Sequence, residues 1–125
     1  MIHGSGIDII EVSRIRKALQ RYGQRFLDRL FSSKEQNYCL RHQDASPHFA
    51  GRFAAKEAIV KALGTGFGSE VHWLDIEILN DALGKPVVHF STRLRKPYLN
   101  ANILLSISHC KEYATAMAIW TDLNK

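Results

Sequence analysis

The stretch FAGRFAAKEAIVKALGTGFG, residues Phe49–Gly68, joins a helical pattern of apolar residues to a glycine-rich ending. Its apolar positions recur every three or four residues and are rich in alanine, which favours helix. Gly64 is placed to end the helix as a C-cap. Small residues such as Gly51 and Ala54 would let another backbone approach closely. The stretch therefore predicts an amphipathic central helix, from about Pro47 to Leu63, lying on a sheet.

Four charged groups on this helix are spaced so that they can converge beside one ligand. Arg52, Lys56 and Lys61 are separated by four and five residues, and Glu57 lies four residues before Lys61,. A polyanion held together with a metal would suit them. Glu57 and Lys61 also fit an ordinary surface pair, worth roughly 0.2–0.5 kcal/mol. The Gly-Thr-Gly at 64–66 is a weak phosphate signature, because it follows a helix and lacks the Walker lysine pattern.

One acid interrupts an apolar, strand-like run near the beginning of the sequence. Asp8 lies between isoleucines in the run Gly4–Val12,. On a half-exposed strand it would simply occupy the polar face, whereas a buried Asp8 needs a cation to offset its desolvation. Asp8 and Glu57 together would make an oxygen-rich site of the kind that Mg²⁺ prefers.

The segment Leu104–Trp120 predicts two antiparallel strands around a polar turn at Cys110–Glu112,. His109, at the strand end, is a candidate phosphate ligand or proton-transfer group, although a lone histidine beside a turn is usually solvated or hydrogen-bonded. The pair Ser108-His109 is not a hydrolase signal, because no Gly-x-Ser-x-Gly elbow is present.

The remaining patterns place strands toward both ends of the chain and helices between them, which predicts an α+β fold. A chain of 125 residues is expected to form one domain, residues 1–125, that buries roughly two thirds of its unfolded surface,. The expected strands are Ile2–Ile10, Trp73–Leu79 and Val87–Phe90, and the expected helices are Val12–Leu30 with a break near Gly23, Ser33–Arg41 and a short one at Thr92–Tyr98.

The first helix carries much of the formal net charge of +5. Arg14, Arg21 and Arg25 have spacings of seven and four, which predicts one basic face. For an isolated helix a solvated face is the ordinary interpretation, and an acidic partner is the alternative. A separate buried stripe is expected from Ile15, Leu19, Tyr22 and Phe26.

Five motifs occur in order along the chain: Gly-Ile-Asp-Ile at 6–9, Arg-Phe-Ala-Ala-Lys-Glu-Ala at 52–58, Gly-Thr-Gly at 64–66, Gly-Lys-Pro at 84–86 and Ser-Ile-Ser-His at 106–109. In this order the motifs resemble those of the holo-acyl-carrier-protein synthases, the trimeric branch of the 4′-phosphopantetheinyl transferases. The chain departs from the family pattern at Cys110 and in the segment 39–48, which matches no motif. The resemblance implies a small α+β subunit in a homotrimer, with active sites at the subunit interfaces.

The resemblance also implies a reaction and roles for residues. The 4′-phosphopantetheine of coenzyme A would pass to a serine of an apo acyl carrier protein, leaving adenosine 3′,5′-bisphosphate, in support of fatty acid biosynthesis. Asp8 and Glu57 would hold Mg²⁺ and Lys61 the diphosphate, while either Glu57 or a metal-bound water would deprotonate the serine. Arg14, Arg21 and Arg25 would face the acidic carrier protein. Coenzyme A would contact Arg52, Lys56, Lys61, Gly64, Thr65, Gly66, Lys85, Pro86, Ser108 and His109.

Two other function classes fit parts of the sequence. A nucleic-acid-binding module would explain the basic helix, but the chain has no RNP, zinc-finger or recognition-helix motif. A Mg²⁺-dependent nuclease or phosphatase would use the same carboxylates with water as the acceptor. We expect neither a nucleic-acid nor a membrane partner. Cys39 and Cys110 lack metal-type spacing and no secretory leader is evident, so we expect a reduced cytoplasmic protein,.

Overall fold

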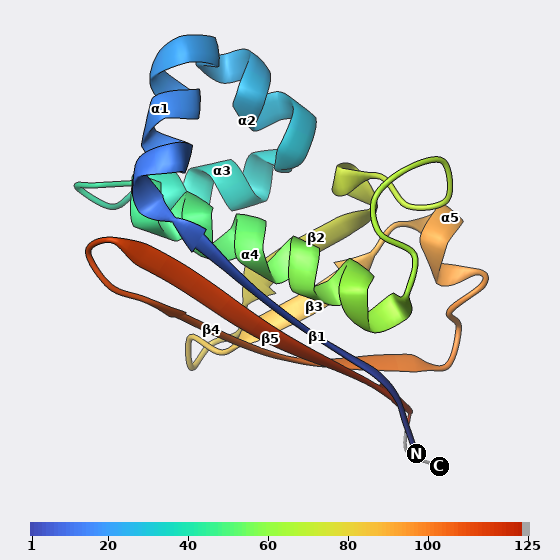
Figure 1. The fold of residues 1–125 in the computed structure, drawn as a ribbon. Helices are drawn as coiled ribbons and strands as arrows, with labels where there is room; N and C mark the ends of the chain where they lie inside the picture. Colours follow the sequence, from blue (N-terminus) through green and yellow to red (C-terminus); the bar gives the residue numbers. More distant parts are fainter. Residues whose placement is uncertain (124–125) are drawn as a thin grey trace.

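The structure is a computed structural model that describes residues 1–123. It confirms the α+β class, with a long helix lying across a three-stranded sheet (Figure 1). The elements in chain order are β1 (Ile2–Glu11), α1 (Val12–Tyr22), α2 (Gln24–Leu30), α3 (Ser33–Leu40), α4 (Ser46–Leu63), the 3₁₀ turn η1 (Trp73–Asp75), β2 (Ile76–Asn80), β3 (Pro86–Phe90), α5 (Thr92–Arg95), β4 (Ala101–His109) and β5 (Tyr113–Asp122).

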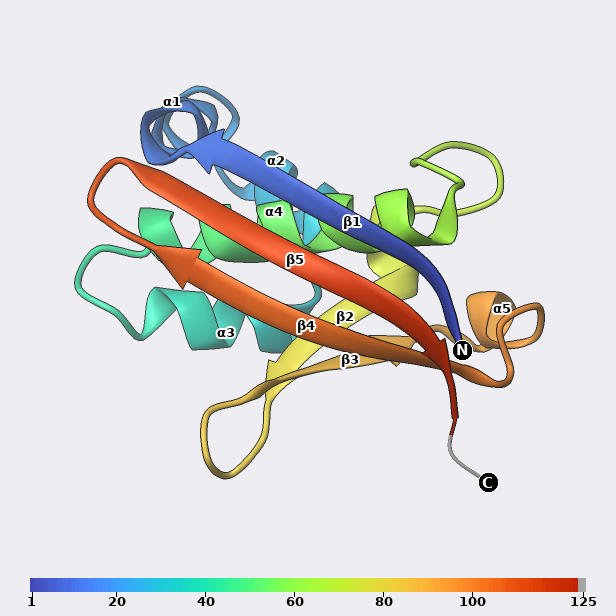
Figure 2. The ribbon, with the colours of Figure 1, turned by 60° about the horizontal axis from the view of Figure 1, so that its bottom comes forward.

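The main sheet has the strand order β1-β5-β4, and both strand pairs are antiparallel (Figure 2). The closing hairpin is confirmed, and its turn lies between His109 and Tyr113. Ile7 pairs with Met117, which pairs in turn with Ser106, so these three side chains share one face of the sheet,. Strands β2 and β3 form a separate antiparallel hairpin.

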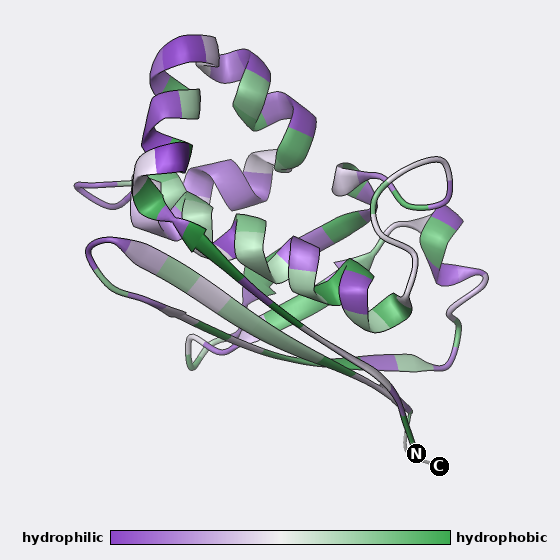
Figure 3. Cartoon of the chain, in the orientation of Figure 1, coloured by the Kyte–Doolittle hydropathy of each residue, from purple (hydrophilic) through white to green (hydrophobic). Residues whose placement is uncertain are grey.

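Helix α4 is more deeply buried than the sequence predicts. An amphipathic helix with one buried stripe was expected, but thirteen of the eighteen residues of α4 are buried. The main sheet covers one side of the helix, while α3 and the β2–β3 hairpin lie on the other (Figures 1 and 2). Since two layers cover α4, its buried residues occupy nearly its whole circumference. By contrast, much of α1 is hydrophilic (Figure 3).

Two glycines bring β1 into backbone contact with α4. A Cβ at Gly6 would lie 1.9 Å from the carbonyl oxygen of Ala58, and one at Gly4 would lie 2.0 Å from that of Ala62. Only glycine allows this approach without displacing the strand. The contact places the next inward-facing residue of β1, Asp8, beside the turn of α4 that precedes Ala58, where Glu57 lies.

The basic segment is divided at Gly23, as the sequence predicts. Gly23 has φ 57°, a left-handed conformation that suits glycine, and α2 begins at the next residue,. Because the helix axis changes there, the spacing of four between Arg21 and Arg25 no longer places them on one helical face. The predicted burial of Tyr22 is wrong, since this side chain is exposed at the end of α1.

Helix α3 begins at Ser33, as the sequence predicts, whereas the start of β2 differs from the prediction. Helix α3 is capped by Ser32, whose hydroxyl accepts from the Glu35 amide, while the Glu35 carboxylate accepts from the Ser32 amide,. The expected strand Trp73–Leu79 begins only at Ile76, because Trp73–Asp75 forms a 3₁₀ turn. The Asp75 carboxylate stabilises this turn by accepting a hydrogen bond from the His72 amide. No helix within residues 1–123 has the length and apolar character needed to cross a membrane.

Candidate functional site

Asp8, Glu57 and Lys61, which we call the carboxylate corner, come together where β1 crosses α4. The Lys61 Nζ donates to Asp8 Oδ1 at 3.1 Å and to the Ile7 carbonyl oxygen at 3.0 Å. Glu57 lies one helical turn before Lys61 on α4 and interacts electrostatically with both Asp8 and Lys61,. Although the three residues lie far apart in the sequence, they form one charged cluster.

The electrostatics of the corner favour a bound cation. Partial burial raises the pKa of Glu57, the nearby Asp8 carboxylate raises it further, and Lys61 opposes both effects,. A metal ion would relieve the repulsion between the two carboxylates. Within residues 1–123 no group of three or more His, Cys, Asp or Glu side chains is arranged to hold a metal. Two carboxylates, with water and substrate phosphate completing the shell, are instead typical of Mg²⁺.

A second site, which we call the anion pocket, opens on another side of α4 with a volume of about 190 Å³. Arg52 forms part of its wall, with its guanidinium 4.1 Å from the centre of the Tyr38 ring and one Nη hydrogen-bonded to Asn80. The Nε of Arg52 is buried and has no hydrogen-bond partner among the described residues. Because a buried, unpaired N–H is costly, this donor marks the pocket as a binding site. The pocket is lined by Tyr38, Pro47, His48, Gly51, Arg52, Asn80, Gly84, Pro86, Ile107 and His109.

Two imidazoles, His48 and His109, line this pocket, and a third, His42, stacks on His48 beside it. His42 and His48 are stacked with ring centroids 3.5 Å apart, and the His109 ring lies 5.0 Å from that of His48. Burial lowers the pKa of His48 to about 4, and the neighbouring His42, His109 and Arg52 contribute to the shift. Sequence reasoning proposed His109 but missed His42 and His48. These two lie in or beside the segment that matched no motif, and only the tertiary fold brings them to β4.

Lys56 corrects the sequence-based assignment to coenzyme A. Its ammonium group is fully buried and forms an ion pair of 2.9 Å with Glu35, whose side chain is also fully buried. It also donates to the carbonyl oxygens of Leu30 at 2.6 Å and Trp73 at 3.1 Å. With all three of its donors engaged inside the protein, Lys56 has none left for a phosphate.

The Gly64–Gly66 loop serves as the C-cap of α4. Gly64 has φ 79°, its amide donates to the Lys61 carbonyl, and the amides of Thr65 and Gly66 donate to Val60,. These amides are therefore occupied, and they lie at the helix end whose dipole disfavours anions. A contact between this loop and the adenosine moiety stays a prediction.

Of the other residues predicted to contact coenzyme A, only some lie at the anion pocket. Pro86 lines the anion pocket. Lys85 is exposed in the β2–β3 turn, where its amide donates to Asp81. Ser108 points away from α4, onto the outer face of the sheet, because it alternates with Ile107 and His109 along β4,. In one subunit, then, Ser108 does not join His109 at the pocket.

The carboxylate corner and the anion pocket lie on different sides of the subunit. Arg52 and Glu57 are five positions apart on α4 and point roughly 140° apart, because each residue turns the helix by about 100°. Asp8 and His109 lie on β1 and β4, the two opposite edges of the sheet. Those edges are about 10 Å apart, since neighbouring strands lie about 4.8 Å apart. The two sites therefore face different directions on the chain.

The arginines predicted to meet a protein partner are all exposed. Arg14 and Arg21 lie on α1 and Arg25 lies on α2. The guanidinium of Arg21 lies 5.3 Å from the centre of the exposed Tyr22 ring. Together with Arg29 near the end of α2, these three arginines give the surface of α1 and α2 a strong positive charge.

Comparison with known proteins identifies the family. Residues 4–118 match the model of the 4′-phosphopantetheinyl transferase superfamily, and the chain belongs to this family. It is 55% identical over 121 residues to the holo-[acyl-carrier-protein] synthase of Protochlamydia amoebophila, covering 97% of this chain and 99% of that protein.

Solved structures of the same class resemble the whole fold. A holo-(acyl-carrier-protein) synthase from Bacillus anthracis, in complex with CoA (3′,5′-ADP), is 43% identical with a TM-score of 0.84, covering 99% of both chains. The holo-[acyl-carrier-protein] synthase from Neisseria meningitidis is 32% identical with a TM-score of 0.89, covering 98% of this chain and 100% of that one.

Proposed function

We propose that this protein is a holo-[acyl-carrier-protein] synthase, which transfers 4′-phosphopantetheine from coenzyme A to a serine of an apo acyl carrier protein. The observation that carries the proposal is the carboxylate corner, where two acids from β1 and α4 meet the ammonium group of Lys61. The relatives named above bear this activity in their names, and the Bacillus anthracis enzyme was crystallised in complex with CoA (3′,5′-ADP). The released product is adenosine 3′,5′-bisphosphate.

The chemistry requires neutralisation of the diphosphate and of the charge that grows on the leaving group. We propose that Asp8 and Glu57 hold Mg²⁺, which when bound would offset negative charge on the phosphate oxygens. Lys61 would contact the same diphosphate with an ammonium group that is half exposed and already oriented by Asp8 and the Ile7 carbonyl. Arg52, Pro86 and His109 would hold the adenosine bisphosphate in the anion pocket.

Incubation of the protein with coenzyme A, Mg²⁺ and an apo acyl carrier protein tests the proposal directly. The mass of the carrier should increase by one phosphopantetheine, and adenosine 3′,5′-bisphosphate should be released in equal amount. An unchanged carrier mass would refute the proposal. Release of 4′-phosphopantetheine and adenosine 3′,5′-bisphosphate from coenzyme A without a carrier would instead favour a hydrolase that uses the same carboxylates with water as the acceptor.

Replacing Lys61 by methionine should lower kcat much more than it changes the KM for coenzyme A. An ammonium group that meets developing charge stabilises the transition state more than the bound substrate. Steady-state kinetics with coenzyme A varied would measure both constants. A variant with a raised KM and a normal kcat would show that Lys61 supplies uniform binding only.

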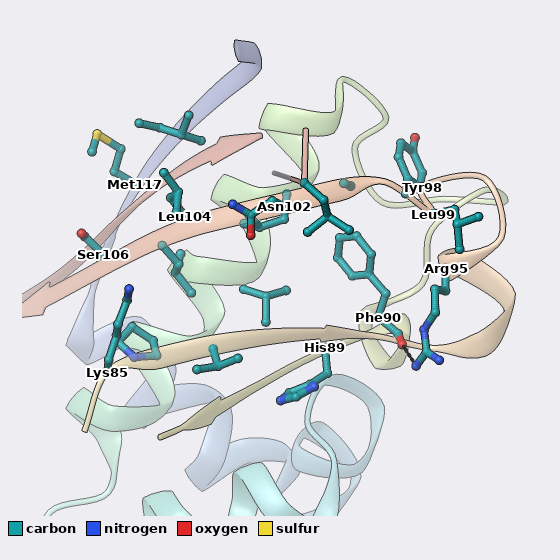
Figure 4. Close-up of a pocket in the computed structure, with 18 residues that line it drawn as sticks. Lys85, His89, Phe90, Arg95, Tyr98, Leu99, Asn102, Leu104, Ser106 and Met117 are labelled. Carbon is teal, nitrogen blue, oxygen red and sulfur yellow. Dashed lines mark hydrogen bonds between the residues drawn. The ribbon is translucent and has the colours of Figure 1, made fainter. Parts of the chain in front are cut away.

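We propose that the active protein is a homotrimer and that coenzyme A binds between subunits. The outer face of the main sheet carries an apolar surface through which subunits could associate. It consists of four exposed side chains, Ile7, Ile9, Leu104 and Met117. A groove of about 710 Å³ runs from this face to β3, with Leu104 and Met117 at one end and Phe90 and Tyr98 at the other (Figure 4). Association through this face would also bring one subunit's carboxylate corner toward another's anion pocket.

Replacing Met117 by glutamate should break the assembly, because it places a charge at the centre of this apolar face. We expect light scattering to give the mass of three chains for the wild type and of one chain for the variant, with transfer lost in parallel. Leu83→Glu is the matched control, because Leu83 is 95% exposed in the β2–β3 turn, away from the sheet face. A wild-type monomer with full activity would contradict the proposal.

We propose that Arg14, Arg21 and Arg25 attract the acidic surface of the carrier. Single exposed ion pairs contribute roughly 0.2–1 kcal/mol each, so one alanine substitution should have little effect. Reversing all three arginines to glutamate should raise the KM for the carrier, and rising salt should weaken the wild-type reaction. The KM for coenzyme A should stay the same.

Kinetics with each substrate varied separately would measure this effect. A variant with Lys34 and Lys96 reversed to glutamate is the control, because both lysines are exposed but lie outside α1 and α2. An unchanged carrier KM in the folded triple variant would mean that these arginines form only a solvated face.

We also propose a cytoplasmic location. The two cysteines are free, Cys39 in the core and Cys110 at the exposed turn between β4 and β5. Free thiols of this kind are typical of reducing compartments. Burial raises the pKa of Cys39 to about 12, which keeps this thiol protonated and unreactive,.

A further inference from the structure

We propose that His48, stacked on His42 and facing His109, is a phosphate-binding residue of the anion pocket that takes up a proton when a phosphate monoester dianion binds. The inference rests on the proposed function, in which this pocket receives the adenosine bisphosphate part of coenzyme A. It concerns His42 and His48, which lie outside the five motifs of the sequence.

The three imidazoles of this cluster come from separate elements, and His48 and His109 line the pocket. His48 lies in the first turn of α4, His42 in the loop after α3, and His109 at the end of β4. The ring of His48 contacts both of the others, and it lines the same pocket as Arg52, whose Nε is buried and has no hydrogen-bond partner among residues 1–123. Two kinds of nitrogen donor therefore face one cavity, an arrangement suited to an anion.

Positive groups outnumber negative ones around His48. Arg41 and Arg52 both pack on the Tyr38 ring of α3, with guanidinium carbons 5.4 and 4.1 Å from its centre. Within the described part of the chain, the carboxylate that raises the pKa of His48 is that of Asp44. Asp44 is already engaged, since it accepts from Arg16 at 2.8 Å and from the Ser46 amide at 3.2 Å.

The excess of positive groups decides whether His48 is protonated when the pocket is empty. With burial, two further imidazoles and Arg52 acting on it, His48 has a pKa of about 4 and is neutral near pH 7,. A neutral imidazole avoids repulsion within the empty cluster, but it presents at most one N–H to a ligand.

A bound dianion reverses the balance. Negative charge in the pocket favours imidazolium and raises the pKa of His48 toward and beyond its ordinary value. Because the complex then holds more protons than the free protein, affinity must increase as pH falls, by up to about tenfold per pH unit for one proton. The gain ends where the ligand phosphate itself becomes protonated, near its second pKa of about 6.

Calorimetric titration of the whole protein with adenosine 3′,5′-bisphosphate, in two buffers of different ionisation enthalpy, tests the inference. At pH 7 the wild type should take up a measurable fraction of a proton, and its affinity should increase severalfold from pH 8 to pH 6.5. In His48→Gln the uptake should fall and the pH dependence should flatten. Protonation of the ligand contributes equally to both proteins, so the difference isolates His48.

Two further variants serve as controls. His89→Gln should behave as the wild type, because His89 is an exposed histidine on β3 outside the cluster. His42→Gln should raise the pKa of His48 in the free protein, measured by NMR, because His42 is one of the groups that lower it. This second readout holds even if His48→Gln folds poorly.

The outcomes separate the two proposals. Binding of the bisphosphate with equal proton uptake in wild type and His48→Gln would overturn the role of His48 and leave the proposed function intact. Failure of the wild type both to bind the bisphosphate and to modify the carrier would overturn the proposed function and, with it, this inference.

Discussion

Replacing Lys56 by methionine is expected to lower the free energy of unfolding by about 3–5 kcal/mol, the usual cost of removing one member of a buried ion pair. The substitution would leave the Glu35 carboxylate buried without its cation. It would also leave the carbonyl oxygens of Leu30 and Trp73 without the ammonium that now binds both. Glu35 would keep its bonds to the amides of Ser32 and Ile78, which offset only part of the loss.

Denaturant unfolding at a fixed protein concentration would measure this loss. Lys34→Met is the matched control, because Lys34 is exposed on α3 and should change stability by less than about 0.5 kcal/mol,. The double variant Glu35→Leu, Lys56→Met should recover much of the stability, since an apolar pair of similar volume often replaces a buried ion pair well. Equal stability of Lys56→Met and the wild type would show that the pair contributes nothing.

Lys56 also marks the limit of what the local sequence can say about this helix. A lysine beside a glutamate on a charged helix resembles a ligand group as much as a structural one. Burial on both sides of α4 decides between them, and it depends on α3 and the β2–β3 hairpin, which the periodicity of residues 49–68 does not contain. The same two-sided burial explains why the predicted amphipathic pattern was wrong.

The carboxylate corner was more accessible to sequence reasoning. Asp8 was conspicuous as a lone acid among isoleucines, and Glu57 and Lys61 were spaced to share one helical face. Their contact depends on Gly4 and Gly6, which bring β1 against the carbonyl oxygens of α4. The glycines are visible in the sequence, but a close approach of two backbones has no local signature.

The anion pocket was predicted only in part. Of the residues that line it, Arg52, Pro86 and His109 were proposed from motifs, whereas His48 and Asn80 were not. His48 lies in the first turn of α4, and Asn80, at the end of β2, joins the pocket through its hydrogen bond with Arg52. Side chains brought together in this way follow no fixed spacing along the chain.

Replacing Glu57 by alanine should nearly abolish phosphopantetheine transfer while leaving the fold intact. Glu57 is only partly buried, and truncating it removes an acid whose pKa is already raised by burial and by Asp8, so relief of repulsion offsets the lost contacts. If Glu57 and Asp8 hold Mg²⁺, its loss removes several kcal/mol of charge stabilisation from the transition state. Since 1.36 kcal/mol corresponds to a factor of ten, the rate should fall by roughly a hundredfold or more.

Carrier mass after timed incubation would give the rates for the wild type, Glu57→Ala and Asp8→Ala. Glu70→Ala is the control, because Glu70 is exposed in the loop after α4 and should leave the rate unchanged. Removal of divalent metal from the wild type should reproduce the loss, and added Mg²⁺ should restore the wild type far better than either corner variant. Full activity of folded Glu57→Ala in metal-free buffer would overturn the metal assignment and leave Lys61 to contact the diphosphate without a metal.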